Sequence, residues 1–103
     1  MSNAHDIIAK STELGKLTRS FISSLDEFTD NIESEISRID GAVTTAGTGG
    51  WSGEIYEAFS ETMNDRLSSL RSLARRASSI SERLEECAVT YDRIIEFYRR
   101  AGG

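Results

Sequence analysis

Apolar residues recur about every 3.6 residues through both halves of this 103-residue chain, and this period constrains the fold more than any other feature. The series in the first half is Ile7, Leu14, Leu17, Phe21, Leu25, Phe28, Ile32, Ile36, Ile39 and Val43. The series in the second half is Trp51, Ile55, Phe59, Met63, Leu67, Leu70, Leu73, Ala77, Ile80, Leu84, Cys87, Tyr91, Ile94 and Tyr98. Strands would need an alternation of period two, which neither half shows. No proline interrupts either half, so nothing forces a break in a long helix. The pattern therefore predicts two long helices.

A glycine cluster divides the two halves. The stretch 41–50 carries four glycines and no charged residue, a composition typical of a loop. We therefore expect one domain over residues 1–103, with a first helix over about 5–43 and a glycine loop over about 41–50. A Trp-x-Gly turn over 51–53 and a second helix over about 53–99 complete it. The predicted fold class is all-α, an antiparallel two-helix hairpin.

The two apolar stripes differ in width, which bears on assembly. At about 100° per residue, the first stripe covers roughly 100° of its helix and the second roughly 180°. One antiparallel neighbour can bury the first stripe, but it cannot bury all of the second. We therefore expect two hairpins to pair into a four-helix bundle, as an obligate or near-obligate dimer. The residues expected in the core or the dimer contact are Phe59, Met63, Leu67, Leu70, Leu73 and Leu84.

Composition excludes several classes of function. A net charge of −5 opposes binding to nucleic acid, and no apolar stretch is long enough for stable membrane insertion. His5 and Cys87 are each the only residue of their type, and Cys87 falls on the apolar series, where we expect a core residue. We expect no catalytic, cofactor-binding or metal site, and no enzyme activity. Residues 1–10 show no signal peptide of the usual kind.

The segment Trp51-Ser-Gly-Glu is the most specific motif of the chain. Ser52 suits the N-cap of the second helix, and Gly53 removes a side chain at the turn. Trp51 is either an aromatic plug over Ile39 and Val43 or part of a recognition surface. A hundred-residue helical hairpin with a central Trp-x-Gly resembles the WXG family, small proteins of type VII secretion related to the early secreted antigenic target. The residues that match are Trp51, Gly53, Ala58 and Phe59.

The resemblance implies a way of acting. Proteins of that family form hairpins that pair as homodimers or heterodimers, so the implied partner is a second copy or a paralogous WXG protein. They leave Gram-positive or actinobacterial cells folded, through a secretion ATPase complex and without a cleaved signal. The resemblance thus implies a cytoplasmic protein that becomes a secreted one. The alternative that we keep is a non-secreted helical adaptor or chaperone-like dimerisation module. A membrane-active effector is disfavoured by the net charge of −5.

The export signal of the family is incomplete here. That signal is Tyr-x-x-x-Asp/Glu, but Tyr91 is followed four places later by Ile95, and Tyr98 by Gly102. Glu96 lies one place too far from Tyr91, about 100° off the expected helix face. Either a partner carries the signal, or a variant signal involves Tyr91 and Glu96.

Overall fold

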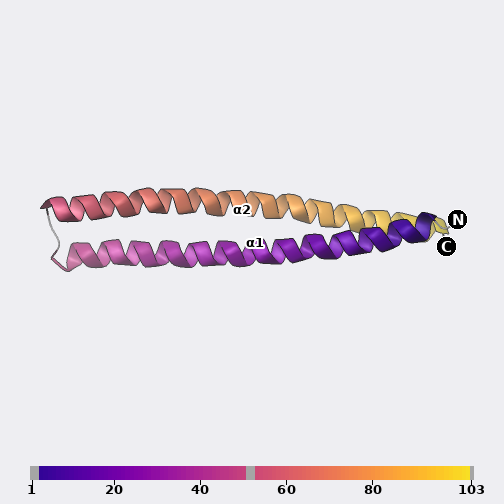
Figure 1. Cartoon of the computed structure of the whole chain (residues 1–103), viewed down its shortest axis with the longest axis horizontal. Coiled ribbons are helices and arrows are strands. Elements are labelled where there is room, and N and C mark those ends of the chain that lie inside the picture. Colours follow the sequence, from indigo (N-terminus) through magenta and orange to yellow (C-terminus); the bar gives the residue numbers. More distant parts are fainter. Residues whose placement is uncertain (1–2, 51–52, 103) are drawn as a thin grey trace. The chain divides into compact units, whose positions relative to one another are not determined.

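The computed structural model describes residues 3–50 and 53–102, and these form two long helices that pack as a hairpin (Figure 1). Helix α1 spans Asn3–Thr48 and helix α2 spans Gly53–Gly102. Residues 3–50 and 53–102 contain no strand, and the predicted all-α helical hairpin is confirmed. Trp51 and Ser52, the expected tip and N-cap, lie outside the described residues.

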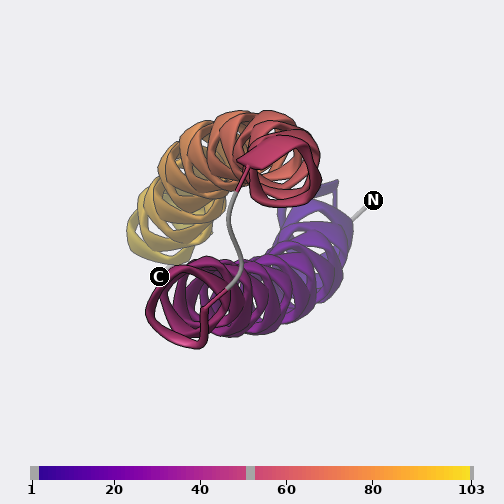
Figure 2. The ribbon, with the colours of Figure 1, turned by 90° about the vertical axis from the view of Figure 1, so that its left-hand side faces the viewer.

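The chain divides into two compact units, and each contains a stretch of both helices. The first unit combines α1 up to residue 26 with α2 from residue 78, and holds the ends of the chain. The second unit spans residues 27–77, and the end of α1 and the start of α2, which belong to it, face the viewer in Figure 2. The contacts described below each lie within one unit.

Within both units, most of the buried and half-buried residues follow a seven-residue repeat with alternating steps of four and three. We call these residues the seam. On α1 the seam is Ala4, Ile8, Ser11, Gly15, Thr18, Ile22, Leu25, Thr29, Ile32, Ile36, Ile39, Val43 and Ala46. On α2 it is Tyr56, Ser60, Met63, Leu67, Leu70, Ala74, Ala77, Ser81, Leu84, Ala88, Tyr91, Ile95 and Tyr98. This is the heptad pattern of two helices that follow each other as in a coiled coil.

The seam differs in composition between the two units. In the second unit large aliphatic residues are buried, with Ile32 and Ile39 each 6% exposed and Leu67 3% exposed. Full burial of such a side chain contributes about 1.5–3 kcal/mol. In the first unit the buried residues are small or polar, and Ser81 donates a hydrogen bond to Asp26 Oδ1 at 3.2 Å. The larger hydrophobic contribution therefore comes from the second unit.

The glycine loop expected over 41–50 is wrong, because α1 continues to Thr48. A glycine inside a helix costs about 1 kcal/mol, but Val43 and Ala46 occupy seam positions and gain by packing on α2. The helical bonding extends to the Gly49 N–H, which donates to the Thr45 carbonyl oxygen at 2.8 Å. Positive φ first occurs at Gly50, where φ is +94°. Packing thus overrides the low helix propensity of this stretch.

The expectation that one neighbour buries the stripe of the first helix is also wrong. Leu14, Leu17, Phe21 and Phe28 are 42%, 54%, 57% and 43% exposed. A seam between two helices has a period of 3.5 residues and takes two positions in seven. A series of period 3.6 drifts off such a seam into the neighbouring row of the same helix.

On α2 the outcome is mixed. The expectation that part of its wide stripe stays exposed is confirmed, since Ile55, Leu73 and Ile80 are 73%, 40% and 49% exposed. Leu73, which we expected in the core or the dimer contact, is therefore not buried between the two helices. The expected core position of Cys87 is wrong, because this residue is exposed. Both belong to the row of α2 that lies immediately beside the seam.

Candidate protein-interaction surface

The heptad places every exposed residue relative to the seam. We letter the repeat a to g, with a and d in the seam, so that Gly15 and Ser81 are a residues and Thr18 and Leu84 are d residues. Around a helix, the e row then borders the seam on one side and the g row on the other, with the c row beyond g. In an antiparallel hairpin the e rows of both helices share one edge, and the g rows share the opposite edge.

The edge formed by the e rows is polar and carries the ion pairs between the helices. In the first unit the Arg19 guanidinium lies 2.5 Å from Asp92 Oδ2, and in the second the Arg71 guanidinium lies 3.4 Å from Asp40 Oδ2. All four side chains are about half exposed, so each pair contributes at most about 1 kcal/mol. Both pairs join α1 to α2 within one chain, and the Arg71–Asp40 pair links the acidic end of α1 to the basic middle of α2.

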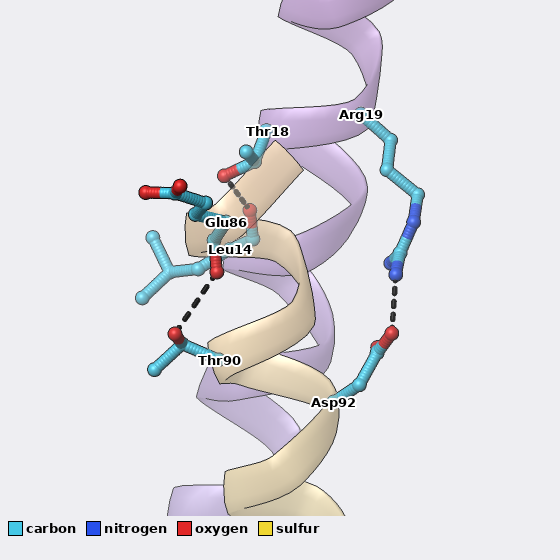
Figure 3. Close-up of polar contacts among 6 residues, drawn as sticks. All are labelled: Leu14, Thr18, Arg19, Glu86, Thr90 and Asp92. Atoms are coloured by element: carbon cyan, nitrogen blue, oxygen red, sulfur yellow. Dashed lines mark hydrogen bonds and ion pairs between the residues drawn. The ribbon is translucent and has the colours of Figure 1, made fainter. Parts of the chain in front are cut away.

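The opposite edge is apolar and exposed. Of the nine large hydrophobic residues that are exposed among residues 3–50 and 53–102, eight lie in a c or g row. Those eight are Leu14, Leu17, Phe21, Phe28, Ile55, Leu73, Ile80 and Phe97, and together with Cys87 we call them the apolar edge. In Figure 3 the Leu14 side chain projects to the side opposite the Arg19–Asp92 pair. The ninth, Val89, is a b residue on the other side of α2.

Both units contribute to the apolar edge. In the first unit it includes Leu14, Leu17, Phe21 and Ile80, and in the second it includes Phe28 and Leu73. Near the connection, a hollow of about 500 Å³ opens on the same side of the second unit, and Ala42, Ala46 and Phe59 are among its lining residues. Exposed apolar surface gathered on one side of a unit in this way marks sites of protein–protein contact.

Among the residues expected in the core or dimer contact, Met63, Leu67, Leu70 and Leu84 lie in the seam. Phe59 is half-buried in the g row, and Leu73 belongs to the apolar edge. A repeat of seven residues could have separated the seam residues from the residues of the apolar edge. It is visible in the sequence as Leu14, Phe21 and Phe28 on the first helix and as Leu73, Ile80, Cys87 and Ile94 on the second.

The residues considered for export recognition do not form one exposed group in the part of the chain that the structure describes. Gly53 is exposed at the start of α2 with a φ of +67°, whereas Trp51 lies outside the described residues. Tyr91 is half-buried in the seam, where its Cβ would lie 3.7 Å from a Cβ at Gly15. Glu96 is exposed and accepts a hydrogen bond from Arg100 Nε at 3.0 Å. Tyr91 and Glu96 therefore do not share one exposed face.

Two kinds of site are absent from the described residues. Residues 3–50 and 53–102 contain no cluster of three or more His, Cys, Asp or Glu side chains that could hold a metal ion. Over the same ranges, neither helix has a stretch long and apolar enough to cross a membrane.

Comparisons of the chain with protein-family models, with curated proteins and with solved structures give no match.

Proposed function

We propose that this protein acts by protein–protein contact, as a helical hairpin whose apolar edge docks against a second helical hairpin. The supporting observation is the segregation of its surface: of the nine large hydrophobic residues that are exposed in the described ranges, eight lie in two adjacent rows of the heptad. Burying such an edge against two further helices gives a four-helix bundle, in which each helix has two neighbours. The free energy gained is about 25 cal/mol for each Å² of apolar surface removed from water.

A test of this docking compares two exposed apolar residues on opposite sides of the hairpin. Phe21, at 57% exposure, lies on the apolar edge, and Val89, at 45%, lies off it. Phe21→Gln should weaken the self-association of the purified chain at least ten-fold, and Val89→Gln should leave that self-association unchanged. Analytical ultracentrifugation measures association, and circular dichroism verifies that both variants remain helical. Equal effects of the two substitutions would contradict docking through the apolar edge.

We further propose that the pathway in which this hairpin acts is type VII secretion, as an exported substrate or a co-secreted partner. The support is the resemblance to the WXG family, which Trp51 and Gly53 carry between two long helices. The glycine of that motif has a φ of +67°, which an L-amino acid with a side chain rarely adopts. A partner that carries the export signal fits the seam position of Tyr91 better than a variant signal in this chain does. The second candidate remains a non-secreted helical adaptor, which would use the same edge.

Secretion is tested in a cell that has a type VII apparatus. Trp51→Ala and Gly53→Val should yield a helical protein that is made in the cytoplasm but fails to reach the culture medium. Supernatant and lysate are probed together with a cytoplasmic marker as the lysis control. Normal export of both folded variants would contradict a recognition role for the motif. Absence of the parent protein from the medium would favour the adaptor.

A further inference from the structure

Charged residues are sorted between the two edges in an unusual way. The whole chain has 17 acidic and 12 basic residues. The c and g rows, however, contain one acidic residue, Glu35, and that carboxylate lies 3.1 Å from the Arg38 guanidinium. The same rows contain five basic residues, which are Lys10, Arg38, Arg66, Arg76 and Arg83. The apolar edge of an acidic protein is thus bordered by positive charge.

The first unit shows this sorting most clearly. Its c and g rows hold Leu14, Leu17, Phe21 and Ile80 together with the bases Lys10 and Arg83. Acidic residues of this unit lie in the other rows, for example Glu13 and Glu86 in the f row. Any helix that packs on the apolar edge of this unit therefore meets Lys10 and Arg83 at its border.

This border disfavours a second copy as the partner. When two copies pack edge on edge, in either direction, their c and g rows border each other, so basic residues face basic residues. Like charges across an interface are unfavourable, whereas opposite charges steer association and select the partner. The acids of the e rows do not relieve this, because they lie on the opposite edge, where Asp40 and Asp92 are paired with Arg71 and Arg19.

We propose that the apolar edge binds a different helical protein, whose own apolar face is bordered by acidic side chains. This inference rests on the proposed function, in which the edge docks against a helical hairpin, and it names the chemistry of that partner. A helical partner also fits the spacing of the edge. Leu14, Phe21 and Phe28 recur every seven residues, as the side chains of a facing heptad helix do.

An anionic membrane is the competing ligand for a basic-bordered apolar face. The net charge of −5 opposes it, since the remaining surface carries most of the acidic residues and would face the same lipid headgroups. Flotation with vesicles of phosphatidylcholine and phosphatidylserine in a 7:3 ratio, chosen as a standard anionic composition, tests it directly. Binding of the parent chain that is lost in Lys10→Glu/Arg83→Glu would overturn the proposal in favour of the membrane.

The chain itself supplies the probe for the protein partner. The double variant Lys10→Glu/Arg83→Glu keeps the apolar edge and reverses the charge at its border in the first unit, so this unit has the chemistry of the proposed partner. Sedimentation equilibrium measures the association of the parent alone, of the variant alone and of the equimolar mixture. The mixed complex should have a dissociation constant about ten-fold lower than either homodimer, and this advantage should shrink at high salt.

A matched control has the same change of charge away from the edge. Lys16 and Arg93 lie in the b and f rows of the same unit, and Lys16→Glu/Arg93→Glu should show no such preference for the parent chain. The two failures are distinguishable. If the parent self-associates as tightly as the mixture does, the acid-bordered partner is wrong while docking through the edge stands. If neither the parent nor the mixture associates up to about 100 μM, weaker than the range of specific interfaces, both proposals fail.

Discussion

At the scale of single residues, Gly41 and Gly47 distinguish a helix from a loop. Both lie inside α1, and a Cβ at Gly41 would meet no atom within 4 Å. A Cβ at Gly47 would lie 3.1 Å from the Tyr56 hydroxyl oxygen, so Tyr56 would have to shift.

Gly41→Ala should therefore stabilise the protein by about 0.5–1 kcal/mol, because alanine has the higher helix propensity. Gly47→Ala should gain less or lose stability. Urea denaturation followed by circular dichroism measures both free energies of unfolding. A clear loss of stability in Gly41→Ala would contradict the helical conformation and favour the loop that glycine content alone predicts.

Gly53 differs from both, because its constraint comes from the backbone and not from neighbours. Among the described residues, no atom outside the adjoining backbone lies within 4 Å of a Cβ placed there, yet its φ is +67°. Gly53→Ala should lower the free energy of unfolding by about 1–2 kcal/mol, the cost of a left-handed conformation in a residue with a side chain. The same urea titration measures it, with Gly41→Ala as the control. An unchanged midpoint would show that this turn accepts another conformation.

At the scale of the helices, Leu67 and Leu73 separate the seam from the apolar edge. Leu67 is 3% exposed, whereas Leu73, six residues further along α2, is 40% exposed. Leu67→Ala should cost about 2–5 kcal/mol of stability, and Leu73→Ala about 1 kcal/mol or less in the monomeric chain. Thermal unfolding at a concentration where light scattering shows a monomer measures both. Equal losses would mean that the buried face of α2 has been assigned incorrectly.

The existence of the two helices could be predicted from the sequence, but their buried faces and the end of α1 could not. The period of the apolar residues predicts two helices, because that signal persists over about ten turns in the first half and about thirteen in the second. It does not separate Leu25 in the seam from Phe21 and Phe28 beside it, since one averaged period runs through both rows. The sequence predicts that the first helix ends near residue 43, whereas α1 ends at Thr48, and the reason for this difference is separate. Gly41 and Gly47 have low helix propensity, but the packing of Val43 and Ala46 on α2 decides the conformation, and that packing is not a local property of the sequence.

The interaction surface could be predicted only in part. The width of the second apolar stripe indicates that a hairpin leaves apolar residues exposed, and the exposure of Leu73 and Ile80 confirms this. The contribution of Leu14 and Phe21 depends on which residues of α1 face α2. That choice is made by the pairing of the helices, since the small residues Ser11 and Gly15 enter the seam in place of their larger neighbours.

At the scale of the whole molecule, we expect assembly to cover the apolar edge and to leave the remaining surface exposed to solvent. Cys87 is the only cysteine of the chain, and it is exposed on that edge. Its rate of reaction with a maleimide therefore reports directly on whether the edge is covered. Val89, exposed on the other side of α2, offers the matched position, as Val89→Cys in a Cys87→Ser chain.

The decisive measurement is the maleimide labelling rate of Cys87 with and without an excess of the acid-bordered probe chain, Lys10→Glu/Arg83→Glu, carrying Cys87→Ser. Assembly through the apolar edge should slow labelling at Cys87 at least ten-fold, because the thiol is then buried between two hairpins, and should leave the Val89→Cys rate unchanged. Protection of Val89→Cys with continued labelling of Cys87 would contradict it, as would unchanged rates at both positions in a complex that sedimentation shows to have formed.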